Sequence, residues 1–197
     1  MRGRFLAFEG GEATGKTTQA RLLAERLGAV LTREPGGTEA GERVRSIVLD
    51  PSVPLSFRAE ALLMAAARAQ HVSEVIEPAL AAGRHVVTDR FTASSLAYQG
   101  VGRGLGVDQV AALSDFATGG LEPDLVLLLD LPLDVTAARL SDVPDRLEQE
   151  GAPFHARVGA AFRQLAAADP ARWVLVPAAG TVEEVAERVW EAVHRLR

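Results

Sequence analysis

The sequence contains no cysteine, few aromatic residues and no excess of positive charge. Without cysteine, the chain can form neither disulfides nor thiolate metal sites. Its formal net charge of -5 at pH 7 argues against general nucleic-acid binding, which requires a basic surface. No apolar run reaches the ~18 residues of a membrane span, and no signal peptide is predicted before the first strand. We therefore expect a cytoplasmic protein with no membrane or nucleic-acid partner, which captures any anionic substrate with locally concentrated arginines.

The 197 residues, 48% of them hydrophobic, predict one domain spanning 1–197. Short apolar runs alternate with helical patterns, which is typical of an α/β fold with a parallel sheet covered by helices on both faces. The predicted strands are Arg4–Glu9, Ala29–Arg33, His85–Asp89, Leu125–Asp130 and Trp173–Pro177. The predicted helices are Gly15–Leu27, Glu39–Leu49, Ser56–Ala82, Thr92–Gln99, Asp108–Thr118, Pro132–Leu140, Pro153–Ala168 and Thr181–Leu196. In such sheets, ligands bind beyond the carboxyl ends of the strands.

A glycine-rich stretch after the first strand fits the phosphate-loop pattern, Gly, four residues, Gly-Lys-Thr. Its glycines allow backbone N–H groups to surround a phosphate, and the following helix adds the positive end of its dipole. Lys16 is placed to reach the outer phosphates, and the Thr17 hydroxyl to ligate Mg²⁺. The predicted nucleoside triphosphate site comprises Gly10, Gly11, Glu12, Ala13, Thr14, Gly15, Lys16, Thr17 and Thr18.

Two further strands end in a carboxylate, at Asp89 and at Asp130. Either carboxylate can serve the metal ion, and the sequence alone does not decide between them. We choose Asp89, because Arg90 beside it can hold phosphate oxygens through two parallel hydrogen bonds. The four histidines show no metal-ligand spacing, so we predict surface or structural roles for them.

Other polar residues follow the strands or line the neighbouring helices. Arg33 and Glu34 end the second strand, and either face the cleft or form a surface ion pair. After the third strand, Ser94 and Tyr98 are four residues apart, as are Ser95 and Gln99, so each pair shares one face of a helix. Met64 and Arg68 have the same spacing on a long helix, where an alternative is a core stripe with an outward-reaching arginine. A proline-broken, charged segment at about 139–150 is predicted to form a lid that carries Arg139 and Arg146.

Taken together, these motifs resemble the thymidylate kinase family, whose members transfer the γ-phosphoryl group of ATP to dTMP. The resemblance rests on residues 9–18, 32–38, 68–71, 89–91, 94–100 and 145–148, in the family's order and spacing. It implies the P-loop NTPase fold of nucleoside monophosphate kinases, Mg²⁺ as cofactor, and a homodimer. It also implies the dTMP-binding residues Glu12, Arg33, Glu34, Arg45, Met64, Arg68, Arg90, Ser94, Ser95, Tyr98 and Gln99.

The resemblance implies particular roles as well. Arg68, Ser95 and Gln99 would hydrogen-bond the thymine ring, with Arg33, Arg45 and Arg90 around the monophosphate. Tyr98 would pack under the deoxyribose, and Glu12 would contact its hydroxyl. Thr17, Asp89 and Glu34 would organise the metal ion. Lys16, Asp89, Arg90 and Arg146 would be the catalytic residues, with Arg139 near the adenine of ATP.

Two departures from the family pattern concern Met64, usually a phenylalanine that stacks on thymine, and Ala13, an arginine in one branch. The alanine indicates the branch whose catalytic cation comes from the lid, with Arg146 as its donor and Arg139 as the reserve. Two other enzymes are alternatives: a deoxynucleoside kinase, or a kinase for another nucleoside monophosphate. A nucleotide-dependent switch is disfavoured, because the sequence lacks the Asn/Thr-Lys-x-Asp segment that reads guanine.

Overall fold

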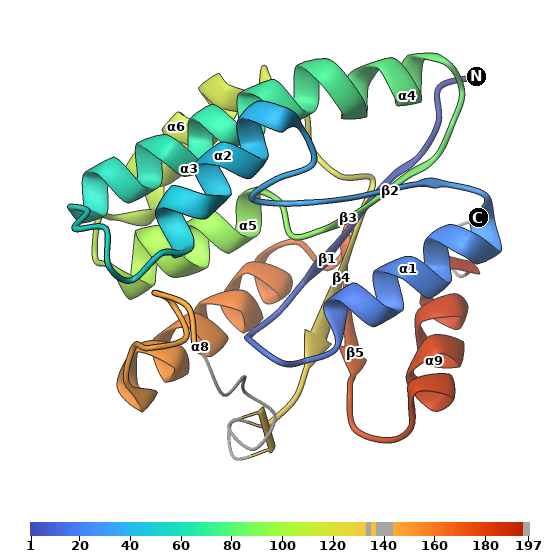
Figure 1. Ribbon diagram of the computed structural model, residues 1–197. Helices are drawn as coiled ribbons and strands as arrows, with labels where there is room; N and C mark the ends of the chain where they lie inside the picture. Colours follow the sequence, from blue (N-terminus) through green and yellow to red (C-terminus); the bar gives the residue numbers. More distant parts are fainter. Residues whose placement is uncertain (133–134, 137–143, 195–197) are drawn as a thin grey trace.

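Five parallel strands form one central sheet in the computed structural model, which describes residues 1–132, 135–136 and 144–194 (Figure 1). Their order is β2-β3-β1-β4-β5. The predicted parallel sheet is confirmed, and three of the strands begin one residue later than predicted. The bounds are β1 Phe5–Glu9, β2 Val30–Arg33, β3 Val86–Asp89, β4 Leu125–Asp130 and β5 Trp173–Pro177.

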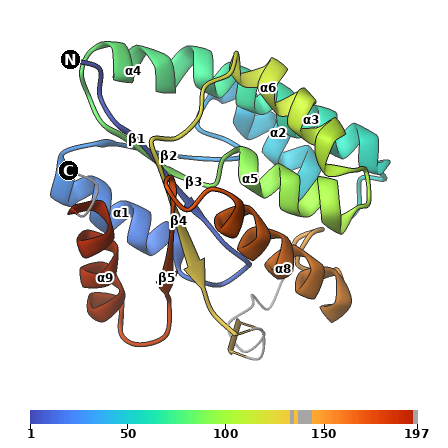
Figure 2. The ribbon, with the colours of Figure 1, turned by 180° about the vertical axis from the view of Figure 1, so that it is seen from behind.

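Helices cover both faces of this sheet, as the two opposite views show (Figures 1 and 2). One face carries α1 (Lys16–Leu27) and α9 (Val182–His194), which pack side by side. The opposite face carries α3 (Phe57–His71), α5 (Thr92–Ser95) and α8 (Ala152–Ala168). Helices α2 (Glu39–Leu49) and α6 (Val107–Thr118) pack against α3. Within the described residues, no helix is long and apolar enough to cross a membrane.

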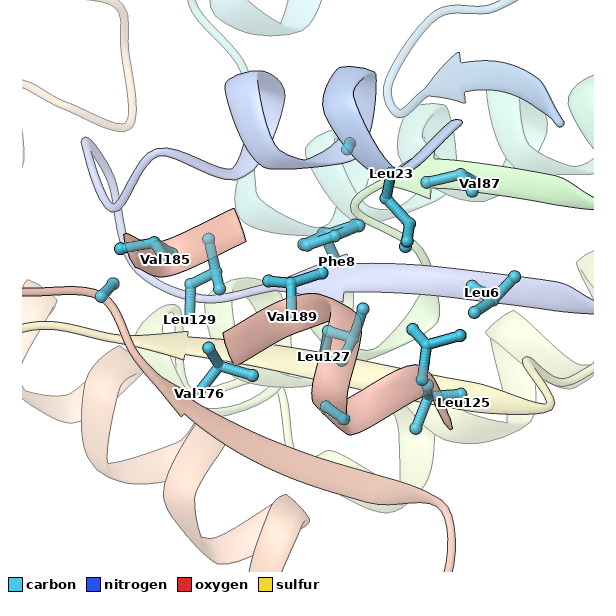
Figure 3. Packing of buried hydrophobic residues seen from close by; sticks show 14 of the residues in the cluster. Leu6, Phe8, Leu23, Val87, Leu125, Leu127, Leu129, Val176, Val185 and Val189 are labelled. Carbon is cyan, nitrogen blue, oxygen red and sulfur yellow. The ribbon is translucent and has the colours of Figure 1, made fainter. Parts of the chain in front are cut away.

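The main core is formed by strand side chains that point to one face of the sheet, while their neighbours in the strand point to the other. Leu6, Phe8, Leu127 and Leu129 point to the α1/α9 face, where they contact Leu23 and Val189 of the two helices (Figure 3). Phe5 and Ala7 belong to a separate cluster on the other side of the sheet. Because neighbours in a strand face opposite ways, near-continuous apolar runs are what a sheet covered twice requires.

Two predicted helices differ from the structure, because each contains a π-helical segment. The predicted helix Ser56–Ala82 is α3, a π segment η1 (Val72–Ile76) and α4 (Glu77–Ala81). Pro78 lies in the first turn of α4, directly after the π segment η1. The predicted helix Thr92–Gln99 consists of α5 and a π segment η2 (Leu96–Gly102). Most of the predicted helix Pro132–Leu140 lies outside the described residues.

The strand ends bring several charged residues to one edge of the sheet. Asp89 at the end of β3 is in register with Phe8 of β1 on one side and with Arg33 of β2 on the other. Glu9, the last residue of β1, is in register with Leu128 of β4. This edge of the sheet therefore combines the phosphate loop after β1 with the Asp89-Arg90 turn after β3.

Candidate active site

The phosphate loop joins β1 to α1, and its backbone requires glycine at two positions. Gly10 has a φ of 143°, and a Cβ there would lie 2.5 Å from the carbonyl oxygen of Leu129. Gly15 has a φ of 92° at the beginning of α1. Residues that carry a Cβ rarely adopt such positive φ values, so both positions favour glycine. At Gly11 a Cβ would meet no atom within 4 Å, so the protein's own packing does not exclude a side chain there.

Lys16 lies buried inside this loop. Its Nζ donates to the carbonyl oxygen of Gly11 at 2.5 Å and lies 3.4 Å from Thr14 Oγ1. Burial, helped by the positive charge of Arg90, lowers the pKa of Lys16 to about 8. A phosphate entering the loop would bring the negative charge that favours the ammonium form.

The two candidate metal carboxylates differ in their surroundings. Thr17 Oγ1 donates to Asp89 Oδ2 at 2.5 Å, while Asp89 Oδ1 is buried without a hydrogen-bond partner among the described residues. Asp130 instead pairs with Arg163, whose Nη2 lies 2.8 Å from Asp130 Oδ1. The described residues contain no cluster of three or more His, Cys, Asp or Glu side chains that could hold a metal ion. The Asp89 Oδ1 atom, unpaired among the described residues, and the neighbouring Thr17 hydroxyl fit Mg²⁺, which binds few protein ligands and fills its shell with waters and phosphates.

Arg90 connects the phosphate loop to the helical segment after β3. Its Nη2 donates to Glu12 Oε1 at 2.8 Å, and its Nη1 to the carbonyl oxygen of Gly10 at 3.1 Å. The Tyr98 hydroxyl donates to the same Glu12 oxygen at 2.6 Å. Burial opposes ionisation of Glu12, but Arg90 and Lys16 outweigh it and lower the pKa of Glu12 to about 2. Glu12 is thus a carboxylate at neutral pH.

Glu9 belongs to this network, although the sequence did not predict a functional role for it. Its side chain is fully buried and accepts hydrogen bonds from Phe91 N at 2.9 Å and Ser94 Oγ at 2.6 Å. Burial raises the pKa of Glu9 to about 7, against the opposing effects of Ser94 and Arg90. Its position at the end of a strand was the only available signal, since its burial depends on how β1 meets α5.

A cavity beside the phosphate loop brings together ten of the eleven predicted dTMP-binding residues. Arg68, Gln99, Arg90 and Glu12 all line it, and Arg90 and Glu12 also pair with each other at the phosphate loop. Five residues that the sequence did not predict for this site also line it: Pro35, Leu49, Phe91, Asp145 and Leu147. The complete lining is Glu12, Glu34, Pro35, Arg45, Leu49, Met64, Arg68, Arg90, Phe91, Ser94, Ser95, Tyr98, Gln99, Asp145 and Leu147. We call this the acceptor cavity.

Arg68 is held at the wall of the acceptor cavity by buried partners. Its Nε donates to Glu34 Oε2 at 2.7 Å, and its Nη2 to Ser95 Oγ at 3.0 Å. The other carboxylate oxygen of Glu34 lies 2.9 Å from His71 Nδ1. Glu34, predicted to organise the metal ion, thus has both oxygens engaged by Arg68 and His71. The alternative of Arg68 reaching outward is wrong, because its side chain is 3% exposed.

Two other predicted arginines, Arg33 and Arg146, make contacts outside the acceptor cavity. Arg33 pairs with Glu42 at 3.0 Å and lines a separate hollow with Thr17, Thr18 and Asp89, so the structure does not bring it to the acceptor cavity. Arg146 donates through Nε to the carbonyl oxygen of Val48 at 3.1 Å and through Nη2 to that of Asp50 at 2.7 Å. The described part of the predicted lid is therefore attached to the end of α2. Arg139 lies outside the described residues.

A phosphate loop lies at the carboxyl edge of a parallel sheet, and its Glu12 lines an adjoining cavity together with Arg90. This is the arrangement of a P-loop nucleoside monophosphate kinase. Comparisons with known proteins agree and are more specific. The family model "Thymidylate kinase" matches residues 8–189. A thymidylate kinase of Synechococcus sp. (strain JA-3-3Ab) is 54% identical over 196 residues, covering 96% of this chain and 94% of the relative.

Two further comparisons point the same way. A thymidylate kinase of Chromobacterium violaceum is 48% identical, covering 93% of this chain and 90% of the relative. A crystal structure of thymidylate kinase from Ehrlichia chaffeensis superposes with a TM-score of 0.83 at 30% identity, covering 98% of this chain and all of the other. The chain therefore belongs to the thymidylate kinase family and phosphorylates dTMP to dTDP. The deoxynucleoside kinase alternative is not favoured.

Proposed function

We propose that this kinase transfers the γ-phosphoryl group of Mg²⁺-bound ATP to dTMP lying in the acceptor cavity. The observation that carries the proposal is the layout of that cavity. Arg68 and Gln99 are suited to hydrogen-bond a base, and Arg90 lies next to the phosphate loop, where the two phosphates must meet. The acceptor phosphate is already anionic, so the reaction requires no general base. Positioning and electrostatic stabilisation supply the rate enhancement.

On the donor side, the loop from Gly10 to Thr18 binds the ATP phosphates, with Lys16 at the outer ones. Thr17 and Asp89 hold Mg²⁺, which neutralises charge on the phosphate oxygens when bound. The buried Asp89 Oδ1 supports this role, because a buried polar oxygen without a partner calls for a ligand or water. Glu34 does not hold the metal ion but accepts a hydrogen bond from Arg68, and so positions the arginine that contacts the base.

On the acceptor side, Arg90 and Arg45 hold the monophosphate while Met64 covers the thymine. Methionine is flexible and polarizable enough to pack against a ring. Tyr98 lies under the sugar and is fixed by its hydrogen bond to Glu12, so a 2′-hydroxyl would have to displace a buried ring. Arg33 contributes less than the resemblance implies, because Glu42 holds it outside the cavity.

A panel of acceptors with Mg²⁺ and ATP tests the proposal. Phosphorylation of dTMP, with thymidine inactive and EDTA abolishing turnover, is the expected result. Phosphorylation of thymidine with dTMP inactive would overturn it. Arg45→Ala should raise the KM for dTMP, whereas the matched variant Arg33→Ala should leave it nearly unchanged; the reverse order would overturn the assignment of the phosphate site.

We also propose that the protein is a homodimer formed through α3 and α6. Large apolar side chains are exposed on these two adjoining helices: Phe116 at 88%, Leu62 at 59%, Phe57 at 49% and Val107 at 39%. Exposed apolar groups that lie close together commonly mark a protein interface. Sedimentation equilibrium should give a mass of two chains, and Phe116→Asp should give one. A wild-type monomer at assay concentration would contradict the proposal.

A further inference from the structure

A buried ion pair lies directly behind the acceptor cavity. Glu60 of α3 is 1% exposed, and its two carboxylate oxygens accept from Arg103 Nη2 at 3.1 Å and Arg103 Nε at 3.2 Å. Arg103 also pairs with Glu150 and lies over the rings of Phe57 and Phe154. An arginine confined in this way leaves the Glu60 carboxylate little freedom to move.

Gln99 connects this pair to the cavity. Its Nε2 donates to Glu60 Oε1 at 2.9 Å, and Gln99 itself is 1% exposed and lines the cavity. A carboxylate accepts hydrogen bonds but cannot donate them. Gln99 must therefore turn its NH₂ group toward Glu60, because the flipped amide would place an oxygen against a carboxylate. The chemistry of the carboxylate therefore fixes this orientation.

The amide oxygen of Gln99 is then left for the ligand. Of the five N–H groups of Arg68, four donate to Glu34, Ser114, Phe91 and Ser95, which leaves one donor without a partner in the described part of the chain. The wall therefore offers one donor and one acceptor. Thymine and uracil match this pattern with a carbonyl oxygen next to a ring N–H. Cytosine presents an amino donor and a bare ring nitrogen instead, so both of its positions would be mismatched.

We propose that Glu60, held by Arg103, is a positioning residue that fixes the carboxamide of Gln99 with its oxygen toward the acceptor base. In this way it selects pyrimidines with a carbonyl oxygen beside a ring N–H and excludes cytosine. The inference rests on the proposed function, because it takes the base to lie against Arg68 and Gln99. A polar group of the base that finds no hydrogen-bond partner in the site costs binding free energy. Because Glu60 sets the orientation of Gln99, the choice of base depends on Glu60, although this side chain does not touch the base.

The test is the isosteric variant Glu60→Gln, whose amide can both donate and accept and so permits Gln99 to flip. Competition binding measures the dissociation constants of dTMP, dUMP and dCMP. The preference for dTMP over dCMP should fall by about 10-fold or more. The dTMP to dUMP ratio should not change, because both bases present the same edge. A loss of affinity equal for all three nucleotides would show a purely structural role and overturn the inference.

Two further variants complete the experiment. Glu150→Gln removes the other carboxylate partner of Arg103 and should leave the preference intact. The double variant Glu60→Gln, Gln99→Glu exchanges the two groups, keeps the number of buried charges and again presents an acceptor to the base. It should restore the preference for dTMP over dCMP, even where the single variant folds poorly. Failure to restore it in the folded double variant would contradict the inference.

The results also separate this inference from the function on which it rests. A wild-type enzyme that does not phosphorylate dTMP would overturn the function itself. Normal turnover of dTMP, combined with an unchanged dTMP to dCMP preference in folded Glu60→Gln, would overturn only the role of Glu60.

Discussion

The two faces of the sheet are built from different chemistry. On the α1/α9 face, the cluster around Phe8, Leu127 and Val189 is aliphatic and aromatic (Figure 3). The opposite face buries several polar groups beneath and around the acceptor cavity, which are Glu9, Glu34, Glu60, Arg68, His71 and Gln99. Buried charges cost free energy unless they are paired, so a fold retains them where they serve a ligand. The comparison separates the face that stabilises the sheet from the face on which we propose that dTMP binds.

The largest effect on activity is expected for a substitution in the phosphate loop, at the edge of the sheet. Lys16→Met removes a cation that neutralises charge on the transferring phosphate, so kcat should fall by ~10³-fold or more. Because Lys16 is buried and its pKa is lowered to about 8 mainly by burial, the methionine should not lower the melting temperature. Steady-state kinetics and thermal denaturation measure the two quantities. If the variant lost activity because it unfolded, the result would contradict a role of Lys16 in catalysis but not in stability.

Leu127→Ala, on the apolar face, should change stability and leave substrate binding unchanged. Leu127 is fully buried between β4 and the α1/α9 layer, so truncation should lower the free energy of unfolding by about 2–5 kcal/mol. The KM for dTMP should stay within about 2-fold, since the cavity lies across the sheet. Urea denaturation and kinetics below the midpoint provide the data. A rise in the KM for dTMP without loss of stability would contradict the different roles of the two faces.

Arg146→Ala tests a residue for which sequence and structure point to different roles. Arg146 donates to the carbonyl oxygens of Val48 and Asp50, so its loss should lower the free energy of unfolding by about 1–3 kcal/mol. The KM for dTMP should rise, because the neighbouring Asp145 and Leu147 line the cavity. Arg146→Lys is the matched control. A ~10³-fold fall in kcat at unchanged stability would instead support the catalytic role that the sequence predicts.

Glu9→Gln should give the smallest effect, which is a change in pH dependence. Burial raises the pKa of Glu9 from 4.5 to about 7, so the folded protein binds more protons than the unfolded chain between these values. This group therefore makes stability fall as pH rises through that window. Glutamine does not titrate, so the difference in melting temperature between pH 5 and pH 8 should shift in favour of pH 8. Parallel melting curves for the two proteins would contradict the assignment.

The sequence predicted more of the donor site than of the acceptor site. Residues 10–18 are contiguous, and their turn depends on local glycine conformation, so the pattern alone predicts them as the phosphate-binding segment. The acceptor cavity collects residues from α2, α3, α5 and η2, and the resemblance to a family supplied most of them. The π segments were not predicted, because their i→i+5 hydrogen bonds leave no mark on a helical pattern. The pairing of Glu60 with Arg103 was also missed, since the two residues are distant in sequence.

The sequence by itself determined the five strands, the phosphate loop and the family to which the chain belongs. These depend on apolar periodicity, glycine conformation and contiguous motifs, which are local properties. Only the tertiary structure decided that Asp130 pairs with Arg163, that Arg146 is attached to α2, and that Glu60 accepts a hydrogen bond from Gln99. Each of these depends on which charged partner a buried group meets after the chain has folded. That choice is set by three-dimensional neighbours and burial, not by residue spacing.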